Sequence, residues 1–335
     1  PFLNHRGFLY VILPAGDVLK RKSTGSSLFK KFSTVKEMTK SKTLTGFIDK
    51  NKAFVASVNQ SRLLKVRKLS RQEIVGSKQE AGLLDHYFTL AFEDKNLYDI
   101  SADNGVFRVG NQACYTFAVN ELDQYPQEMP PVVSFKDYST DRTKVPASYG
   151  LNFGLNLRVN HVYNQILYIP FQQQLVTQLT GEIRRHFSFS AWSRDNTFSM
   201  EQKTAFIDAM KDGMSAVKGH FNIQTFHTDR EKLEEQKDVV SAAIQSTGFI
   251  SKVATTFAEQ LFWSCIPGNA AELGYDHFST LSLDNAVALF NYETNYKDTP
   301  WQNAGILLTD RFGSPRIVDV FFSPLKENLI SNRNF

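Results

Sequence analysis

The segment from Val217 to Gln224 constrains the fold of this chain more than any other. Apolar residues and glycine (Val217, Gly219, Phe221, Ile223) alternate strictly with polar ones (Lys218, His220, Asn222, Gln224). A period of two places successive side chains on opposite faces of a β-strand. Helical patterns flank the segment on both sides, so the strand belongs to a unit that mixes helices with a sheet.

The segments around this strand predict an α+β unit over residues 160–300. In chain order they predict a strand, two helices, the alternating strand, a helix and a last strand. This order is typical of a ferredoxin-like α/β sandwich. The flanking segments are His161–Ile169, Gln172–Phe187, a helix opened by the capping-box pair Ser199 and Gln202, a helix from the pair Thr228 and Glu231 to Gly248, and Phe249–Val253.

Residues 1–119 predict a first α+β unit, a looser version of the same plan. A chain of 335 residues has room for about two domains. Residues 120–159 contain four prolines and a polar, turn-prone run, so they predict a connector across the surface. In the first unit we expect strands at Gly7–Leu13, 97–100, 105–109 and 113–119, and helices at Leu44–Leu64 and Arg71–Phe92.

The charge of the chain is unevenly distributed. Residues 1–80 carry 17 Lys and Arg against 5 Asp and Glu, a net +12, whereas the remainder carries 21 against 29, a net −8. Such a basic stretch attracts the phosphates of nucleic acid or of anionic lipid. The alternative is a solvated loop, which the lack of repeated aromatic residues favours. The candidate anionic-partner patch is Lys20, Arg21, Lys22, Lys30, Lys31, Lys36, Lys40 and Lys42.

The sequence contains no recognisable catalytic motif. A phosphate-binding loop requires a Gly-Lys dipeptide, and the chain has none. The glycine pattern of dinucleotide-binding folds, the Gly-x-Ser-x-Gly elbow and the His-Glu-x-x-His helix are absent as well. We therefore expect this chain to have no catalytic, cofactor-binding or metal-binding residues and no enzymatic activity of its own.

Histidines, cysteines and acidic pairs fit structural roles. His220 and His227 are an odd number of residues apart, which puts them on opposite faces of one strand and argues against a shared metal. Cys114 and Cys265 lie in apolar surroundings without an activating neighbour, so we expect buried structural thiols. The pair Glu234-Glu235 fits a solvated helix face. Two distant cysteines and no apolar run of about 18 residues favour the cytoplasm.

Seven segments, in order along the chain, together resemble the conjugation ATPases of the Bacteroides TraG type, which are VirB-type secretion ATPases. Each segment is weak alone, but the order covers nearly the whole chain. They are Phe2-Leu-Asn-His-Arg6, Tyr138-Ser-Thr-Asp-Arg-Thr-Lys144, His161-Val-Tyr-Asn-Gln165, Ser190-Ala-Trp-Ser-Arg194, Phe262-Trp-Ser-Cys-Ile-Pro-Gly-Asn269, Phe290-Asn-Tyr-Glu-Thr-Asn-Tyr296 and Gly305 to Asp310.

The resemblance implies a region that precedes a motor domain. In that family, the stretch similar to Ser331–Phe335 runs into a phosphate loop, and the family pattern begins upstream of Pro1. The resemblance therefore implies that 301–335 supplies the first strands of a RecA-like domain, with Leu307, Ile317, Val318 and Val320 in strands. ATP and Mg are implied for the full-length parent only.

The resemblance also implies a function for residues 1–300. It implies a docking and assembly region, peripheral at the inner face of the bacterial inner membrane, that binds components of a conjugation or secretion complex and can self-associate. The residues leave two alternatives open. One is a nucleic-acid- or anionic-membrane-binding module that uses the basic stretch 20–71, and the other is a hydrolase with an unconventional site.

Overall fold

The chain has the predicted α+β class. Its computed structural model describes residues 23–24, 31–32, 42–60, 67–90, 99–103, 106–136, 139–189, 194–250, 252–291, 305–309, 315–320, 322–326 and 331. These residues fall into two compact units. The sheet unit holds 100–259 and the described residues from 274 onward, and the helical unit holds those up to 99 together with 260–273.

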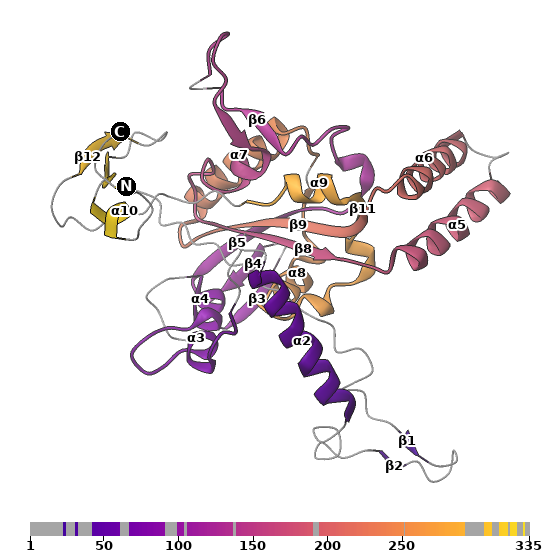
Figure 1. Cartoon of the computed structure of the whole chain (residues 1–335), viewed down its shortest axis with the longest axis horizontal. Coiled ribbons are helices and arrows are strands. Elements are labelled where there is room, and N and C mark those ends of the chain that lie inside the picture. The colour runs from indigo at the N-terminus through magenta and orange to yellow at the C-terminus, as the bar shows by residue number, and fades with distance from the viewer. Residues whose placement is uncertain are drawn as a thin grey trace. The chain divides into compact units, whose positions relative to one another are not determined.

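The sheet unit is built on a seven-stranded antiparallel sheet around β9, the strand that the alternating segment predicts (Figure 1). One edge of β9 pairs with β8, and its other edge pairs with β5 and then β11. The outer edge of β5 pairs with β4 and β10, and β4 pairs with β3. The strands are β3 (Ile100–Asp103), β4 (Val106–Val109), β5 (Gln112–Val119), β8 (His161–Tyr168), β9 (Ala216–His227), β10 (Lys252–Val253) and β11 (Ser279–Ser282).

This topology corrects the expected division of the chain. The sequence placed 1–119 and 160–300 in two separate sandwiches, but β3, β4 and β5 lie in one sheet with β8 and β9. The register runs from Ala113 opposite His227 to Val119 opposite Phe221. Hydrogen bonds between strands about 100 positions apart satisfy the backbone groups of β5, and no local pattern reveals such a pairing.

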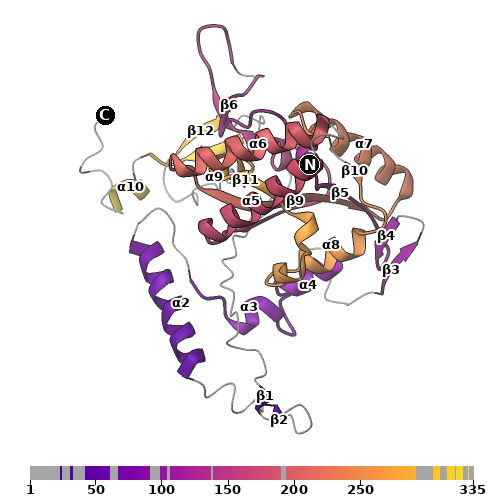
Figure 2. The same ribbon diagram turned by 90° about the vertical axis from the view of Figure 1, so that its right-hand side faces the viewer.

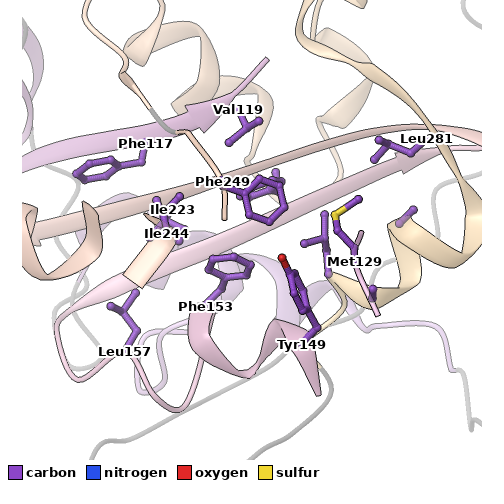
Figure 3. Packing of buried hydrophobic residues seen from close by; sticks show 14 of the residues in the cluster. Phe117, Val119, Met129, Tyr149, Phe153, Leu157, Ile223, Ile244, Phe249 and Leu281 are labelled. Carbon is purple, nitrogen blue, oxygen red and sulfur yellow. The ribbon is translucent and has the colours of Figure 1, made fainter. Parts of the chain in front are cut away.

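One face of the sheet carries the largest hydrophobic core. Phe221 and Ile223 of β9 point into it, and Val240 and Ile244 of α7 (Arg230–Ser246) cover it. Figure 3 shows this packing with the neighbouring aromatic rings. Strand β9 is buried on both faces over residues 216–225, although alternation alone predicts one solvated face.

Residues 120–159 contribute to this core and do not form the expected surface connector. Their elements are η2 (Leu122–Gln124), β6 (Val132–Ser134), β7 (Pro146–Ser148) and η3 (Tyr149–Phe153). The turn η3 places Phe153, which has no exposed surface, 5.6 Å from the ring of Phe221 and 5.9 Å from that of Phe249. The prolines interrupt helices and strands here, but the aromatic residues between them still become buried.

Two long helices form a hairpin in the sheet unit. These are α5 (Gln172–Phe189) and α6 (Arg194–Lys211), which lie side by side (Figures 1 and 2). Leu175, Leu179 and Ile207 form their small core together with Ala216 at the start of β9. The predicted start of α6 at Ser199 is wrong, because the helix already begins at Arg194.

Helix α7 begins close to its predicted start. Its cap is Asp229, whose side chain accepts a hydrogen bond from the Glu231 N–H at 2.9 Å, so the cap predicted at Thr228 is off by one residue. The helix ends before Gly248, whose φ of +86° suits glycine, as the sequence predicts. The short helix α9 (Leu283–Ala288) follows β11 and is capped by Ser282.

The described elements of the helical unit are mainly helices. Helix α2 (Lys42–Gln60) agrees with the prediction, but the expected helix at Arg71–Phe92 is divided into α3 (Arg71–Val75) and α4 (Leu83–Thr89). Gly76, with a φ of +82°, ends α3, and its backbone packs so closely on Gly82 that neither position has room for a side chain. A capping box between Ser70 and Glu73 opens α3.

An aromatic cluster joins α4 to residues 260–273. The Tyr87 hydroxyl donates a hydrogen bond of 2.6 Å to the Phe262 carbonyl, and the two rings lie 5.0 Å apart. Phe88 contacts Phe262 and Trp263, which belong to α8 (Ala258–Ser264). Phe262 is therefore packed in the interior, whereas Trp263 beside it is 39% exposed.

The last described residues form a small hairpin. It consists of β12 (Ile306–Thr309) and β13 (Pro315–Val318), and α10 (Phe322–Lys326) follows. Leu307, Ile317 and Val318 lie in these strands as expected, whereas Val320 does not; the assignment to a RecA-like domain stays a prediction. The predicted strand Gly7–Leu13 lies outside the described residues. Among the helices that the structure describes, none is long and apolar enough to span a membrane.

Candidate functional site

The basic patch falls largely outside the described residues. Of its eight residues, Lys31 lies in the two-residue strand β2 (Lys31–Phe32), which pairs with β1 (Ser23–Thr24), and Lys42 begins α2. The other six lie outside the described ranges. Helix α2 adds the exposed Lys50 and Lys52. The patch therefore stays a prediction.

The structure brings together a polar cluster between α5 and α6 that the sequence analysis missed. The Lys203 ammonium donates to Glu182 Oε2 at 2.8 Å and lies 3.0 Å from His186 Nε2. His186 Nδ1 lies 3.0 Å from Asn196 Oδ1, and the Gln178 amide donates to Glu182 Oε1 at 3.0 Å. We call these five residues the hairpin cluster. Because lysine only donates and a carbonyl oxygen only accepts, the proton of a neutral His186 is on Nδ1.

The hairpin cluster borders an open cavity of about 330 Å³. Its lining is Glu182, Arg185, His186, Asn196 and Lys203. Burial raises the pKa of Glu182, but hydrogen bonds from Lys203 and Gln178 outweigh it and hold the pKa below its usual value. Polar contacts connect Glu182 and His186 of α5 with Lys203 and Asn196 of α6. The hairpin cluster therefore links the two helices.

The ion pair between Glu182 and Lys203 predicts a measurable coupling energy between these two side chains. In a double-mutant cycle of Glu182→Gln and Lys203→Met, we expect a coupling of about 1 kcal/mol, above that of a surface pair, because both side chains are only about one-quarter exposed. Urea unfolding of the four proteins measures it. The exposed pair Asp208 and Lys211 serves as control, with an expected coupling of about 0.3 kcal/mol. If the stability losses of Glu182→Gln and Lys203→Met simply added in the double variant, the two side chains would not stabilise the hairpin through their contact.

A second polar network is buried on β9, on the face opposite the main core. His220 Nδ1 donates to the His277 carbonyl at 2.9 Å, and His220 Nε2 accepts from the Asn222 amide at 3.0 Å. Asn222 Oδ1 in turn accepts from the Asn164 amide at 3.0 Å. Burial lowers the pKa of His220 to about 4, so the ring is neutral at neutral pH. The hydrogen-bonded structural role predicted for His220 is confirmed.

The remaining chemical candidates are structural as well. Cys114 is buried, and burial raises the pKa of its thiol to about 12, whereas Cys265 is only half-buried. Glu234 does not simply face solvent, because it accepts hydrogen bonds from the Tyr115 hydroxyl at 2.5 Å and from Lys237 at 3.0 Å. His227 accepts from the Asp229 N–H. Within the described ranges, no three His, Cys, Asp or Glu residues are grouped to hold a metal ion.

Each helix of the hairpin carries an exposed aromatic side chain. Phe187 at the end of α5 is 68% exposed, and Phe198 in the second turn of α6 is 60% exposed. They flank the family segment Ser190–Arg194, which joins the two helices. Large exposed apolar groups are typical of surfaces that bind another macromolecule. We call Phe187 and Phe198 the hairpin aromatics.

Comparison with known proteins provides no family assignment. No protein-family model matches the chain, and no curated protein matches it. The resemblance to conjugation ATPases therefore stays a prediction.

Proposed function

We propose that the chain is the docking and assembly region of a conjugative-transfer ATPase of the VirB type and is not catalytic by itself. The hairpin aromatics are the observation that carries the proposal. They project from two helices at the segment Ser190–Arg194, one of the segments on which the family resemblance rests. In this proposal the hairpin binds a protein component of the secretion complex at the inner face of the inner membrane.

The energetics of exposure support a partner for these rings. Leaving a phenylalanine side chain in water forgoes roughly 1.5–3 kcal/mol relative to burying it. Aromatic residues are also enriched among those that dominate binding energies at protein interfaces. Two exposed aromatic side chains on one hairpin therefore provide apolar surface for binding another protein.

The hairpin is also preorganised for binding. Its core of Leu175, Leu179 and Ile207 and the ion pair between Glu182 and Lys203 hold α5 against α6. A surface that is already ordered loses less conformational entropy when a partner binds. The hairpin cluster thus supports docking without contacting the partner.

The distribution of perturbed titratable groups supports a non-catalytic role. Catalytic groups with shifted pKa values gather in clefts. Here burial raises the pKa of Tyr125 and Tyr149 to about 12 and lowers that of His220 to about 4. None of these three groups lines the hairpin cavity, and the shifted group that does, Glu182, is held by hydrogen bonds from Lys203 and Gln178.

Capture of membrane proteins tests the docking proposal. The immobilised chain should retain an inner-membrane component of the secretion complex from detergent extracts of cells that carry the conjugative element. Phe187→Asp with Phe198→Asp should reduce the capture at least tenfold, because two charges replace the apolar anchor. Mass spectrometry of the retained proteins measures the amount of the component that each variant captures.

The matched control is Ile250→Asp with Val239→Asp. Both residues are exposed apolar groups in the sheet unit, remote from the hairpin in sequence, and their replacement should leave capture unchanged. A well-folded chain that captures no component of the complex, or capture that both double variants reduce equally, would contradict the proposal.

The alternative function uses the basic stretch 20–71. Its support is the net +12 of residues 1–80. It predicts DNA affinity that falls steeply with salt, with a slope set by the number of phosphates neutralised. Flotation with anionic vesicles separates a lipid partner from DNA. If DNA and vesicles both fail to bind at low salt, this alternative is eliminated.

A further inference from the structure

In the part of the sheet that the structure describes, strand β8 forms an edge. Among the strands that the structure describes, only β9 pairs with it. The Phe226 N–H donates to the Asn160 carbonyl, and residues 160 and 226 are opposite one another in the β8–β9 register. Hydrogen bonding alternates along antiparallel strands, so the backbone groups of Tyr163, Gln165 and Leu167 point away from β9. These groups can bond an added strand.

The edge lacks the features that protect sheet edges. Natural edge strands carry charges, prolines or bulges that discourage pairing with another chain. The sequence of β8 is His-Val-Tyr-Asn-Gln-Ile-Leu-Tyr, without a Lys, Arg, Asp, Glu or Pro. Beyond it, Ile169 and Phe171 are 73% and 77% exposed, and Leu167 and Tyr168 are partly exposed. Pro170 and the start of α5 end this strand, so we call residues 161–169 the β8 edge, with Phe171 beside it.

We propose that the β8 edge pairs with the β8 edge of a second copy of this chain, antiparallel and about a twofold axis at Gln165. In this register Tyr163 is opposite Leu167 of the partner subunit, and Val162 is opposite Tyr168 of the partner subunit. Pairs of aromatic and branched apolar residues are among the favourable cross-strand pairs. A shift of two residues in one direction would place Tyr163 opposite a glutamine instead, and a shift of two in the other direction would place it opposite Ile169 of the partner subunit.

The same register covers the exposed apolar residues without opposing like charges. Ile169 lies opposite His161 of the partner subunit. The nearest charged residue in sequence, Arg158, lies outside β8. Like charges directly opposite one another destabilise a strand pair, and β8 contains no charged residue.

The area involved predicts a weak dimer. The exposed parts of Leu167, Tyr168, Ile169 and Phe171 amount to roughly 400 Å² per copy, or about 800 Å² in total. With the strand backbone, this approaches the total of about 1,000 Å² that a specific interface needs. We therefore expect a dissociation constant of roughly 10–100 µM. The inference does not rest on the proposed function, since the hairpin aromatics are not part of the β8 edge.

Sedimentation of the full chain over a concentration series tests the dimer. The wild-type chain should change from monomer to dimer between roughly 1 and 500 µM. Ile169→Lys with Phe171→Lys should raise the dissociation constant at least tenfold, because it places charges on the pairing edge. Val239→Lys with Ile250→Lys, at exposed apolar positions outside the edge, should leave it unchanged. A monomer at all concentrations, or a dimer that the first pair does not weaken, would overturn the proposal.

A cross-link tests the register. Val162→Cys combined with Tyr168→Cys in a Cys265→Ser background should form a disulfide dimer on mild oxidation, because the two positions are opposite each other across the axis. Within one chain they are about 20 Å apart and cannot bond. Either single cysteine variant should remain largely uncross-linked. Equal cross-linking of the single and double variants would overturn this register.

Discussion

Replacing Phe153 with alanine should lower the free energy of unfolding of the sheet unit by about 3–5 kcal/mol. Phe153 is fully buried, and its ring contacts those of Tyr163, Phe221 and Phe249 from three other segments of the chain. Figure 3 shows Phe153 and Phe249 in this core. Removing the ring leaves a cavity that the sheet and α7 cannot fill. Urea denaturation followed by circular dichroism measures the loss. This is the largest single-residue effect that we expect.

Phe198→Ala provides the control for Phe153→Ala. It removes the same atoms from an exposed site, so unfolding should change by less than about 0.5 kcal/mol. If the two variants lost equal stability, residues 120–159 would not contribute to the core as the structure describes.

The stability of the chain should fall in acid partly because His220 stays neutral while folded. Burial lowers the pKa of His220 from 6.5 to about 4. The unfolded ring takes up a proton as the pH falls below 6.5, whereas the folded ring does so only near pH 4. The contribution of His220 to the free energy of unfolding is therefore fully present above pH 6.5. About 3 kcal/mol of it is lost when the pH falls to 4.

Comparison with His220→Gln isolates this contribution. Carboxylates titrate in the same range, but they do so equally in both proteins and cancel in the comparison. The difference in unfolding free energy between wild type and variant should therefore shrink by about 3 kcal/mol from pH 6.5 to pH 4. Val239→Gln, at an exposed position without a titratable group, should show no such change. A pH-independent difference for His220→Gln would show that the ring is not buried in the neutral form.

Local periodicity predicted the elements of the fold better than their pairing. The alternation around Phe221 identified β9, and helical spacing identified α2, α5 and α7. Pairing of β5 with β9 depends on backbone bonds between distant segments, which leave no local trace. The capping-box spacing at Ser199 predicted the wrong helix start. Helix α6 begins at Arg194, and its first turn carries Asp195, which favours a helix N-terminus.

The proline-rich segment shows how one signal can obscure another. Apolar residues occupy alternate positions from Tyr149 to Leu157, and this pattern was a sign of burial. They divide between two clusters: Tyr149, Phe153 and Leu157 enter the main core, whereas Leu151 and Leu155 pack with Ala147. The prolines correctly predicted broken secondary structure but not solvent exposure.

The hairpin cluster was partly readable from the sequence. Gln178, Glu182 and His186 are spaced four residues apart and therefore share one face of α5. Their partners Asn196 and Lys203 are on the next helix, and the sequence does not specify how the two helices align. The exposed hairpin aromatics and β8 edge were equally hidden, because an apolar residue in a periodic pattern normally predicts a core position.

A competition experiment tests the docking proposal most directly. The chain is expressed in donor cells that carry the conjugative element, and the frequency of transfer is measured. If the chain docks, it should occupy the sites of the full-length ATPase and lower transfer at least tenfold, and Phe187→Asp with Phe198→Asp should restore it. Ile169→Lys with Phe171→Lys, expressed to the same level, should still inhibit, because it leaves the hairpin aromatics intact. Normal transfer in the presence of abundant, folded wild-type chain would contradict the account.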